Sequence, residues 1–204
     1  MIETLLSFAL ATSVLSISPG PDNIFVLTQS IVNGRKFGLA TVIGLISGCL
    51  VHTTLLAFGV SAVIKASESL YTGIKIFGAV YLLYLAYKVY KTDASIMVSK
   101  ENAPKKSTSQ LFKQGFIMNV LNPKVSIFFL AFFPGFLYSE TINTVTQFYV
   151  LGFIFMFVSF IIFSLIAILA GSISKKIKSN TKIGFYFKWI QIIVFILIAV
   201  FILL

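Results

Sequence analysis

The most informative segment of the chain is Ser18-Pro19-Gly20-Pro21-Asp22-Asn23, in the middle of an apolar run over residues 4–31. A run of this length can cross a hydrocarbon core of about 30 Å, but each proline removes a backbone donor and blocks a helical hydrogen bond. In lipid, backbone groups freed in this way are tolerated only where they face protein or a water-filled cavity. The segment Pro19, Gly20 and Pro21 therefore predicts a membrane span that is broken into two half-helices.

Five further apolar stretches are long enough to span a membrane at about 1.5 Å per residue: residues 37–64, 69–90, 111–136, 145–171 and 183–204. Of the 204 residues, 58% are hydrophobic and 11% are charged, and the mean hydropathy is +0.99. Soluble domains carry about 25% charged residues, so the composition excludes an ordinary soluble domain. We predict an all-α integral membrane protein, a single transmembrane domain of six helices over residues 1–204.

A second break is predicted in the fourth stretch, at Asn122-Pro123. The long polar segment 93–110 separates residues 1–92 from residues 111–204, so each half holds three spans and the first span of each is broken. Three spans per half make the second half enter the membrane from the opposite side, which predicts two inverted three-helix repeats. A proline kink that only shapes packing is the simpler interpretation of either break. Interrupted helices at matching places in two halves favour a transporter's binding site.

The basic residues predict the orientation of the chain. Only Lys65 and Lys75 lie near the connection between the second and third spans, whereas 13 of the 16 Lys and Arg residues lie on the other side. These are Arg35, Lys36, Lys88, Lys91, Lys100, Lys105, Lys106, Lys113, Lys175, Lys176, Lys178, Lys182 and Lys188. Because Lys and Arg are enriched in cytoplasmic loops, this side is expected to be cytoplasmic and both termini outside. The net charge of +10 is thus interpreted as topology, with no nucleic-acid partner.

Asp22 is the one acidic residue of six that lies deep in a predicted span. A carboxylate in hydrocarbon costs several kcal/mol unless it is paired, hydrated or protonated, so its default interpretation is functional, as a group that couples to a proton or a substrate. The structural alternative is a helix cap, in which Asp22 accepts amide hydrogens at the start of the second half-helix. Both roles are compatible.

Lys124 is the matching basic residue, directly after Asn122-Pro123 and well inside an apolar stretch. It could approach Asp22 and form an ion pair with which a substrate or a proton competes. Alternatively, its long stem lets the ammonium reach toward one membrane interface. Asn23 and Asn122 would supply neutral hydrogen bonds to a zwitterion, although a single asparagine in a span is more often an interhelical contact.

Small residues recur along the second span at Gly38, Gly44 and Gly48, which indicates a close-packing face between helices. His52 lies one turn beyond Gly48 and is the only histidine. It is more often an interior contact than a ligand in such a setting, and its functional alternative is a proton relay. One histidine and the lone Cys49 give no basis for a metal site or a disulfide, and no cofactor is expected.

The motifs around both breaks resemble those of the LysE/RhtB (lysine exporter and homoserine resistance) family of bacterial amino-acid exporters. In the first half these are Ser18-Pro19-Gly20-Pro21-Asp22 and Asn33-Gly34-Arg35-Lys36-Phe37-Gly38, followed by Gly44 and Gly48. In the second half they are Phe112-Lys113-Gln114-Gly115-Phe116, Asn119, Leu121-Asn122-Pro123-Lys124 and Phe132-Phe133-Pro134-Gly135-Phe136. Gly135 departs from the family pattern, which more usually has a glutamine after the proline.

The resemblance implies a small exporter of the bacterial inner membrane that expels amino acids or related metabolites with the proton gradient. It also implies that Pro19, Gly20, Pro21 and Asp22 form the first break, and Asn122, Pro123 and Lys124 the second. No second carboxylate is available in the spans for a cationic substrate, which mildly favours neutral amino acids. A homodimer is the default for a small symmetric membrane protein.

Two further functional classes compete with amino-acid export. A divalent-cation exporter of a related six-helix fold is the alternative, although one carboxylate, one imidazole and one thiol in the spans are few ligands for it. An enzyme is not expected, because the spans contain no Ser/His/Asp set and no His-Glu metal motif.

Overall fold

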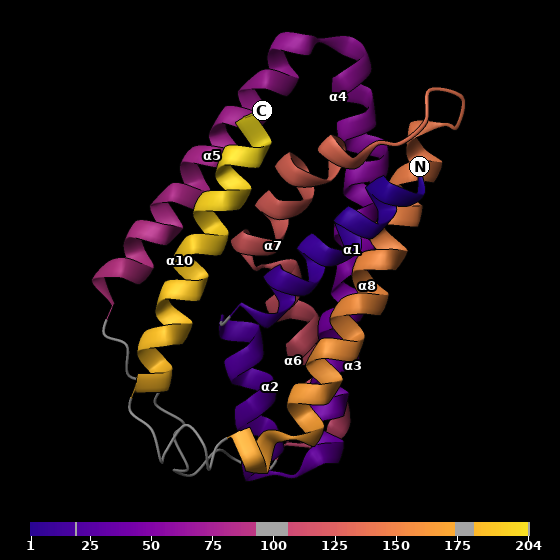
Figure 1. Ribbon diagram of the computed structural model, residues 1–204. Helices are drawn as coiled ribbons and strands as arrows, with labels where there is room; N and C mark the ends of the chain where they lie inside the picture. Colours follow the sequence, from indigo (N-terminus) through magenta and orange to yellow (C-terminus); the bar gives the residue numbers. More distant parts are fainter. Residues whose placement is uncertain (19, 93–105, 174–181, 204) are drawn as a thin grey trace.

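The computed structural model describes residues 1–18, 20–92, 106–173 and 182–203, and every regular element in these ranges is a helix. The predicted break at Pro19 and most of the predicted polar segment 93–110 lie outside the described residues. Both termini lie at one end of the molecule, opposite the end at which α2 leads into α3 (Figure 1). This arrangement fits an even number of crossings.

In the first half, α1 (Ile2–Ile17) is followed by α2 (Pro21–Val32), and the two axes differ by 59°. The second helix begins with Pro21 at its first turn, where a proline costs no hydrogen bond. The chain then continues through α3 (Arg35–Leu55), the π-helical turn η1 (Leu56–Val60), α4 (Ser61–Ala66) and α5 (Glu68–Lys91).

The second half begins with α6 (Thr108–Val120), which is bent by 48° against α7 (Pro123–Ile127) and its continuation. The π-helical turn η2 (Phe128–Phe132) and the 3₁₀ turn η3 (Phe133–Phe136) complete that continuation, and α8 (Thr144–Ile168) and α10 (Lys182–Leu203) follow. The helix α6 starts within the segment that the sequence assigned to a loop, because the side chains of Ser107 and Gln110 form a capping box there.

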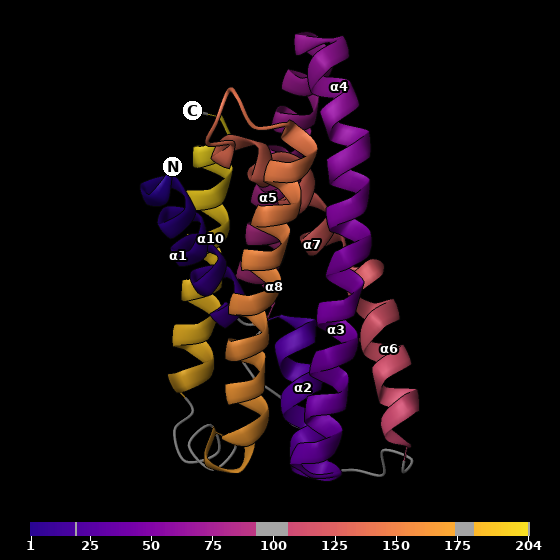
Figure 2. The same cartoon turned by 90° about the vertical axis from the view of Figure 1, so that its right-hand side faces the viewer.

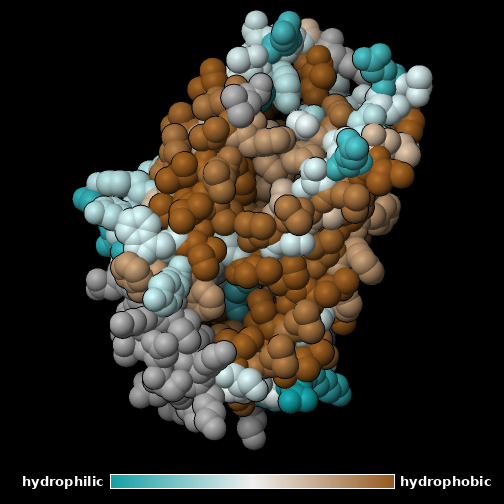
Figure 3. All heavy atoms as spheres, viewed as in Figure 1, coloured by the Kyte–Doolittle hydropathy of each residue, from teal (hydrophilic) through white to brown (hydrophobic). Residues whose placement is uncertain are grey.

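Four helical segments have the length and hydropathy of membrane spans: Arg35–Ile64, Glu68–Lys91, Thr144–Ile168 and Gly184–Leu203. The two bent pairs raise the number to six if each pair is one span. Large apolar side chains on the outer faces of α5, α8 and α10 are exposed, and Figure 3 shows that apolar residues dominate the middle of the face in view, with the hydrophilic residues mostly toward the ends and the left edge. A distribution of this kind is expected of a surface that faces lipid.

The helices α3 and α6 run side by side (Figure 2), and two glycines permit their close approach. A Cβ atom on Gly44 would collide with the backbone carbonyl of Phe112, and one on Gly48 would lie 2.7 Å from Oδ1 of Asn119. Gly38 faces α2 instead, where a Cβ would collide with Ser30. The small residues of α3 thus allow backbone contact between the two halves of the chain.

Aromatic side chains fill the interior at the end where the termini lie. Phe8 of α1 packs edge-on against Phe133, with ring centroids 4.8 Å apart, and Phe129 stacks on Phe133 at 4.1 Å. The π-helical turn that carries Phe128 and Phe129 inward is not predicted by the sequence, because a single extra residue in a helical turn leaves no distinct pattern in an apolar run.

Candidate functional site

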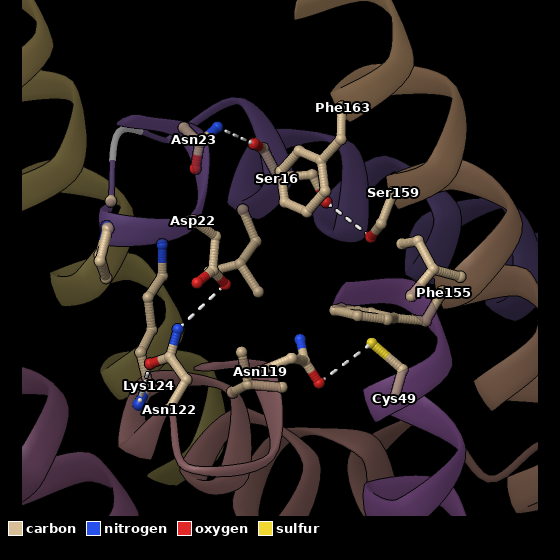
Figure 4. Close-up of a pocket in the computed structure, with 15 residues that line it drawn as sticks. Ser16, Asp22, Asn23, Cys49, Asn119, Asn122, Lys124, Phe155, Ser159 and Phe163 are labelled. Carbon is tan, nitrogen blue, oxygen red and sulfur yellow. Dashed lines mark hydrogen bonds between the residues drawn. The ribbon is translucent and has the colours of Figure 1, made fainter. Parts of the chain in front are cut away.

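The two breaks meet at one small pocket near the middle of the molecule, shown in Figure 4. Its volume is about 30 Å³, which is room for a water molecule or two and far less than an amino acid needs. The polar residues that line it come from six helical segments: Ser16, Asp22, Asn23, Cys49, Asn119, Asn122, Lys124 and Ser159. The structure therefore describes a central polar site that is too small for an amino acid.

Asp22 lies in the first turn of α2 and is only 7% exposed. Its Oδ2 accepts a hydrogen bond of 3.0 Å from Nδ2 of Asn122. The other oxygen, Oδ1, is buried and has no hydrogen-bond partner. Because a buried carboxylate oxygen is costly without a donor, Oδ1 is the atom of the pocket at which the donor of a ligand would be favoured.

Asn122 does two things with one side chain. Its Nδ2 reaches Asp22, while its Oδ1 accepts a hydrogen bond of 3.0 Å from the backbone nitrogen of Lys124 and so caps α7. The second break is thereby tied directly to the carboxylate of the first. This contact joins residues 100 positions apart in the sequence.

Lys124 is half-buried and extends along the pocket wall toward the first break (Figure 4). A Cβ atom on Gly20 would lie 3.5 Å from its Nζ, which lies 5.3 Å from the centroid of the Phe195 ring. No carboxylate of the described residues comes within 4.0 Å of this ammonium. Asp22 and Lys124 share the pocket, but the direct ion pair suggested by the sequence is not formed in this state.

The two charged residues occupy equivalent places in the two broken helices. Pro21 is the first residue of α2 and Pro123 is the first residue of α7, and the charged residue follows immediately in each case. The helix starts that correspond are therefore those at Pro21 and Pro123.

Asn23 connects the two half-helices of the first break. Its Nδ2 donates a hydrogen bond of 2.7 Å to the carbonyl oxygen of Ser16, in the last turn of α1. The hydroxyl of Ser16 in turn lies 2.9 Å from that of Ser159 on α8. Sequence reasoning missed both serines, because a serine within an apolar helix carries no signal that separates a pocket wall from an ordinary helix contact.

His52 lies on α3 one turn beyond the pocket and does not line it. Its Nε2 lies 3.1 Å from the carbonyl oxygen of Asn119, and because a carbonyl can only accept, Nε2 carries the hydrogen. The Asn119 side chain faces the pocket and accepts a weak hydrogen bond of 3.6 Å from Cys49. His52 is therefore linked to the site through the end of α6.

Metal ligands do not gather in the parts of the chain that the structure describes. No group of three or more His, Cys, Asp and Glu side chains forms there. The polar side chains of the central pocket are mostly amides and hydroxyls, with one carboxylate and one ammonium. Opposite charges in one pocket, surrounded by hydrogen-bonding groups, suit a small zwitterion.

The chain is similar in sequence to known membrane proteins. A leucine efflux protein from Enterobacter sp. (strain 638) is 32% identical over 151 residues, which cover 72% of this chain and 72% of that protein. An uncharacterized membrane protein of Bacillus subtilis (strain 168), YrhP, is 29% identical over 144 residues, covering 67% of this chain and 69% of its own length. No solved structure matches the chain.

The family comparison extends over nearly all of the sequence. Residues 13–204, which include both breaks and every described helix except part of α1, match the LysE type translocators. The chain belongs to the LysE type translocator family, and it is a multi-pass membrane protein that functions in amino-acid export.

Proposed function

We propose that the protein is a secondary-active exporter that expels neutral amino acids across the bacterial inner membrane in exchange for protons. The observation that carries this proposal is that Asp22 and Lys124, at equivalent starts of two half-helices, line the same small polar pocket. Discontinuous helices that meet near the middle of the bilayer are the usual binding elements of secondary transporters.

The substrate binds as a zwitterion between the two charges. Its ammonium group donates to Oδ1 of Asp22, the buried oxygen that has no partner. Its carboxylate faces the Lys124 ammonium, which has no carboxylate of the described residues within 4.0 Å. Each charge of the substrate thus compensates one charge of the site, and this compensation offsets the cost of burying both.

Proton coupling follows from competition at Asp22. The ionised carboxylate binds the substrate ammonium from the cytoplasmic side, and protonation from the outer side removes the charge that holds it. Release of the proton to the cytoplasm restores the ionised form for the next cycle. Because the same oxygen takes either the proton or the ammonium, inward proton movement drives outward substrate movement.

The two halves, residues 1–92 and 111–204, act as inverted repeats joined by a cytoplasmic segment, 93–110. Support comes from the matching breaks and from matching contacts: Ser16 of α1 bonds Ser159 of α8, as Asn119 of α6 bonds Cys49 of α3. With the basic residues in the cytoplasm, both termini lie outside. The resemblance to a leucine efflux protein supports a neutral substrate.

Export from cells loaded with dipeptides tests the proposal. We expect release of one or a few neutral amino acids that depends on the protein and stops when a protonophore collapses the proton gradient. The variant Asp22→Asn, at equal membrane abundance, should abolish this release. Release that persists in Asp22→Asn would remove Asp22 from the mechanism. Absence of any amino-acid release, together with a metal-sensitive phenotype, would favour the divalent-cation alternative.

A further inference from the structure

A second, larger cavity lies against the central pocket. Its volume is about 310 Å³, and it is lined by the last residue of α1, one face of α2, the last turns of α8 with Leu169 and Ile173 after them, and the beginning of α10. Asn23 is the single polar residue among the described residues that line it. Figure 3 shows the surface hollowed between α10 and α8, with apolar walls and hydrophilic atoms at the base.

Asn23 is also the residue that both cavities share. Its hydrogen bond of 2.7 Å to Ser16 holds it between them, at the junction of α1 and α2. On α8 the two cavities are again neighbours, since Phe163 faces the polar pocket while Ile162 and Ile166 face the apolar one. Asn23 and Phe163 together form the partition.

The two cavities differ in chemistry in a way that matches one class of molecule. The polar pocket offers a carboxylate and an ammonium for a zwitterionic head group, but at about 30 Å³ it must widen to take even that group and has no space for a side chain. The apolar cavity has the space but no charge. An engineered apolar cavity of about 150 Å³ binds benzene, so about 310 Å³ accommodates a side chain of the size of leucine or phenylalanine.

The position of the apolar cavity also agrees with export. It lies toward the end of the molecule at which α2 leads into α3 at Arg35 and Lys36, the side that the basic residues assign to the cytoplasm. A substrate on its way out would meet this cavity before the polar pocket.

We infer that the apolar cavity between α2, α8 and α10 is the subsite for the side chain of the substrate, which is a large aliphatic or aromatic neutral amino acid. When the substrate enters, Asn23 gives up its hydrogen bond to Ser16 and so opens its part of the partition. The head group and the side chain then occupy two joined cavities. This inference rests on the proposed function. It adds to that function the size of the substrate's side chain and the apolar cavity that selects for this size.

Filling the cavity is the direct test. Leu165 lines it from α8 and is 50% exposed, so Leu165→Trp should fill space without disturbing the core. Ile161, one turn earlier on α8, is 42% exposed and lines none of the described cavities, so Ile161→Trp is the matched control. Export of alanine, valine, leucine and phenylalanine is followed from dipeptide-loaded cells at equal membrane abundance.

We expect Leu165→Trp to lower leucine and phenylalanine export at least about tenfold relative to alanine, since one methylene in an apolar pocket alters selectivity about 10- to 200-fold. Ile161→Trp should keep the wild-type pattern. An equal change for all four amino acids, or none, overturns the inference and is the result expected if a lipid acyl chain fills the cavity. In that case wild-type export still stands, whereas an absence of wild-type export defeats the proposed function itself.

Discussion

The side-chain amide of Asn122 donates a hydrogen bond of 3.0 Å to Oδ2 of Asp22. A residue at the break between α6 and α7 thus holds the carboxylate at the break between α1 and α2. The same asparagine caps α7 through its Oδ1. A single side chain thus sets both the start of the second half-helix and the position of the acid. Any change at Asn122 should be felt at both breaks.

Replacing Asn122 with alanine should reduce export about tenfold or more at equal membrane abundance. The variant leaves both oxygens of Asp22 without a donor, and an unsatisfied buried group costs about 1–3 kcal/mol. Asn122→Ser, which keeps a helix-capping oxygen but is too short to replace the amide, separates the two roles. If the serine variant exports like the wild type, the contact with Asp22 is not required.

The positive charge of Lys124 should make a large contribution to the rate of export. We expect Lys124→Gln to lower the export rate about ten- to a hundredfold, because a hydrogen bond to a charged group is worth about 1.5–3 kcal/mol, whereas Lys124→Arg keeps part of it. Lys113→Gln is the matched control, since Lys113 is exposed on α6. Equal export by the glutamine variants at both positions would show that the Lys124 ammonium does not bind substrate.

The contact between α3 and α6 should be intolerant of side chains. We expect Gly44→Ala to lower the folded yield and the Tm of the detergent-solubilised protein by several degrees, because its Cβ meets the Phe112 backbone. Gly73→Ala, on α5 with no atom within 4 Å of the new Cβ, should be neutral or slightly stabilising. Thermal unfolding followed by size-exclusion chromatography compares the two, and a stable Gly44→Ala protein would contradict this packing.

Substitutions of His52 test whether this residue makes only a structural contact or also relays protons. A glutamine can donate to the Asn119 carbonyl as Nε2 of His52 does, but it does not titrate. We expect His52→Gln to retain gradient-driven export and His52→Ala to lose stability. Measurement of export against external pH completes the test, since loss of export in a well-folded glutamine variant would assign the relay instead.

The helix breaks could be predicted from the sequence because they depend on local chemistry. Pro21 and Pro123 fix backbone angles and remove donors wherever they stand, and both begin a helix in the structure. Asp22 was singled out for the same kind of reason, since a lone acid in an apolar run is conspicuous in any fold.

The partners of these residues could not be predicted, because they depend on how separate helices approach one another. Asn122 rather than Lys124 forms the hydrogen bond with Asp22. Which of the two side chains reaches the carboxylate depends on its length and on its direction across the pocket. Ser16 and Ser159 likewise become neighbours only when α1 packs on α8. The apolar cavity beside Asn23 is formed by ordinary leucines and isoleucines, so nothing in their order along the chain distinguishes it.

The helix α3 belongs to the first half of the chain and α6 to the second, yet Gly44 of α3 lies directly against the backbone of Phe112, and Gly115 of α6 lies directly against the backbone of Thr41. Surfaces that interlock backbone against backbone do not slide past one another freely. The helices α3 and α6 therefore form one rigid unit, although they belong to different halves of the chain. A chimaeric exporter made by exchanging halves between two relatives would need α3 and α6 from the same parent, even though the central segment looks like the natural place to cut.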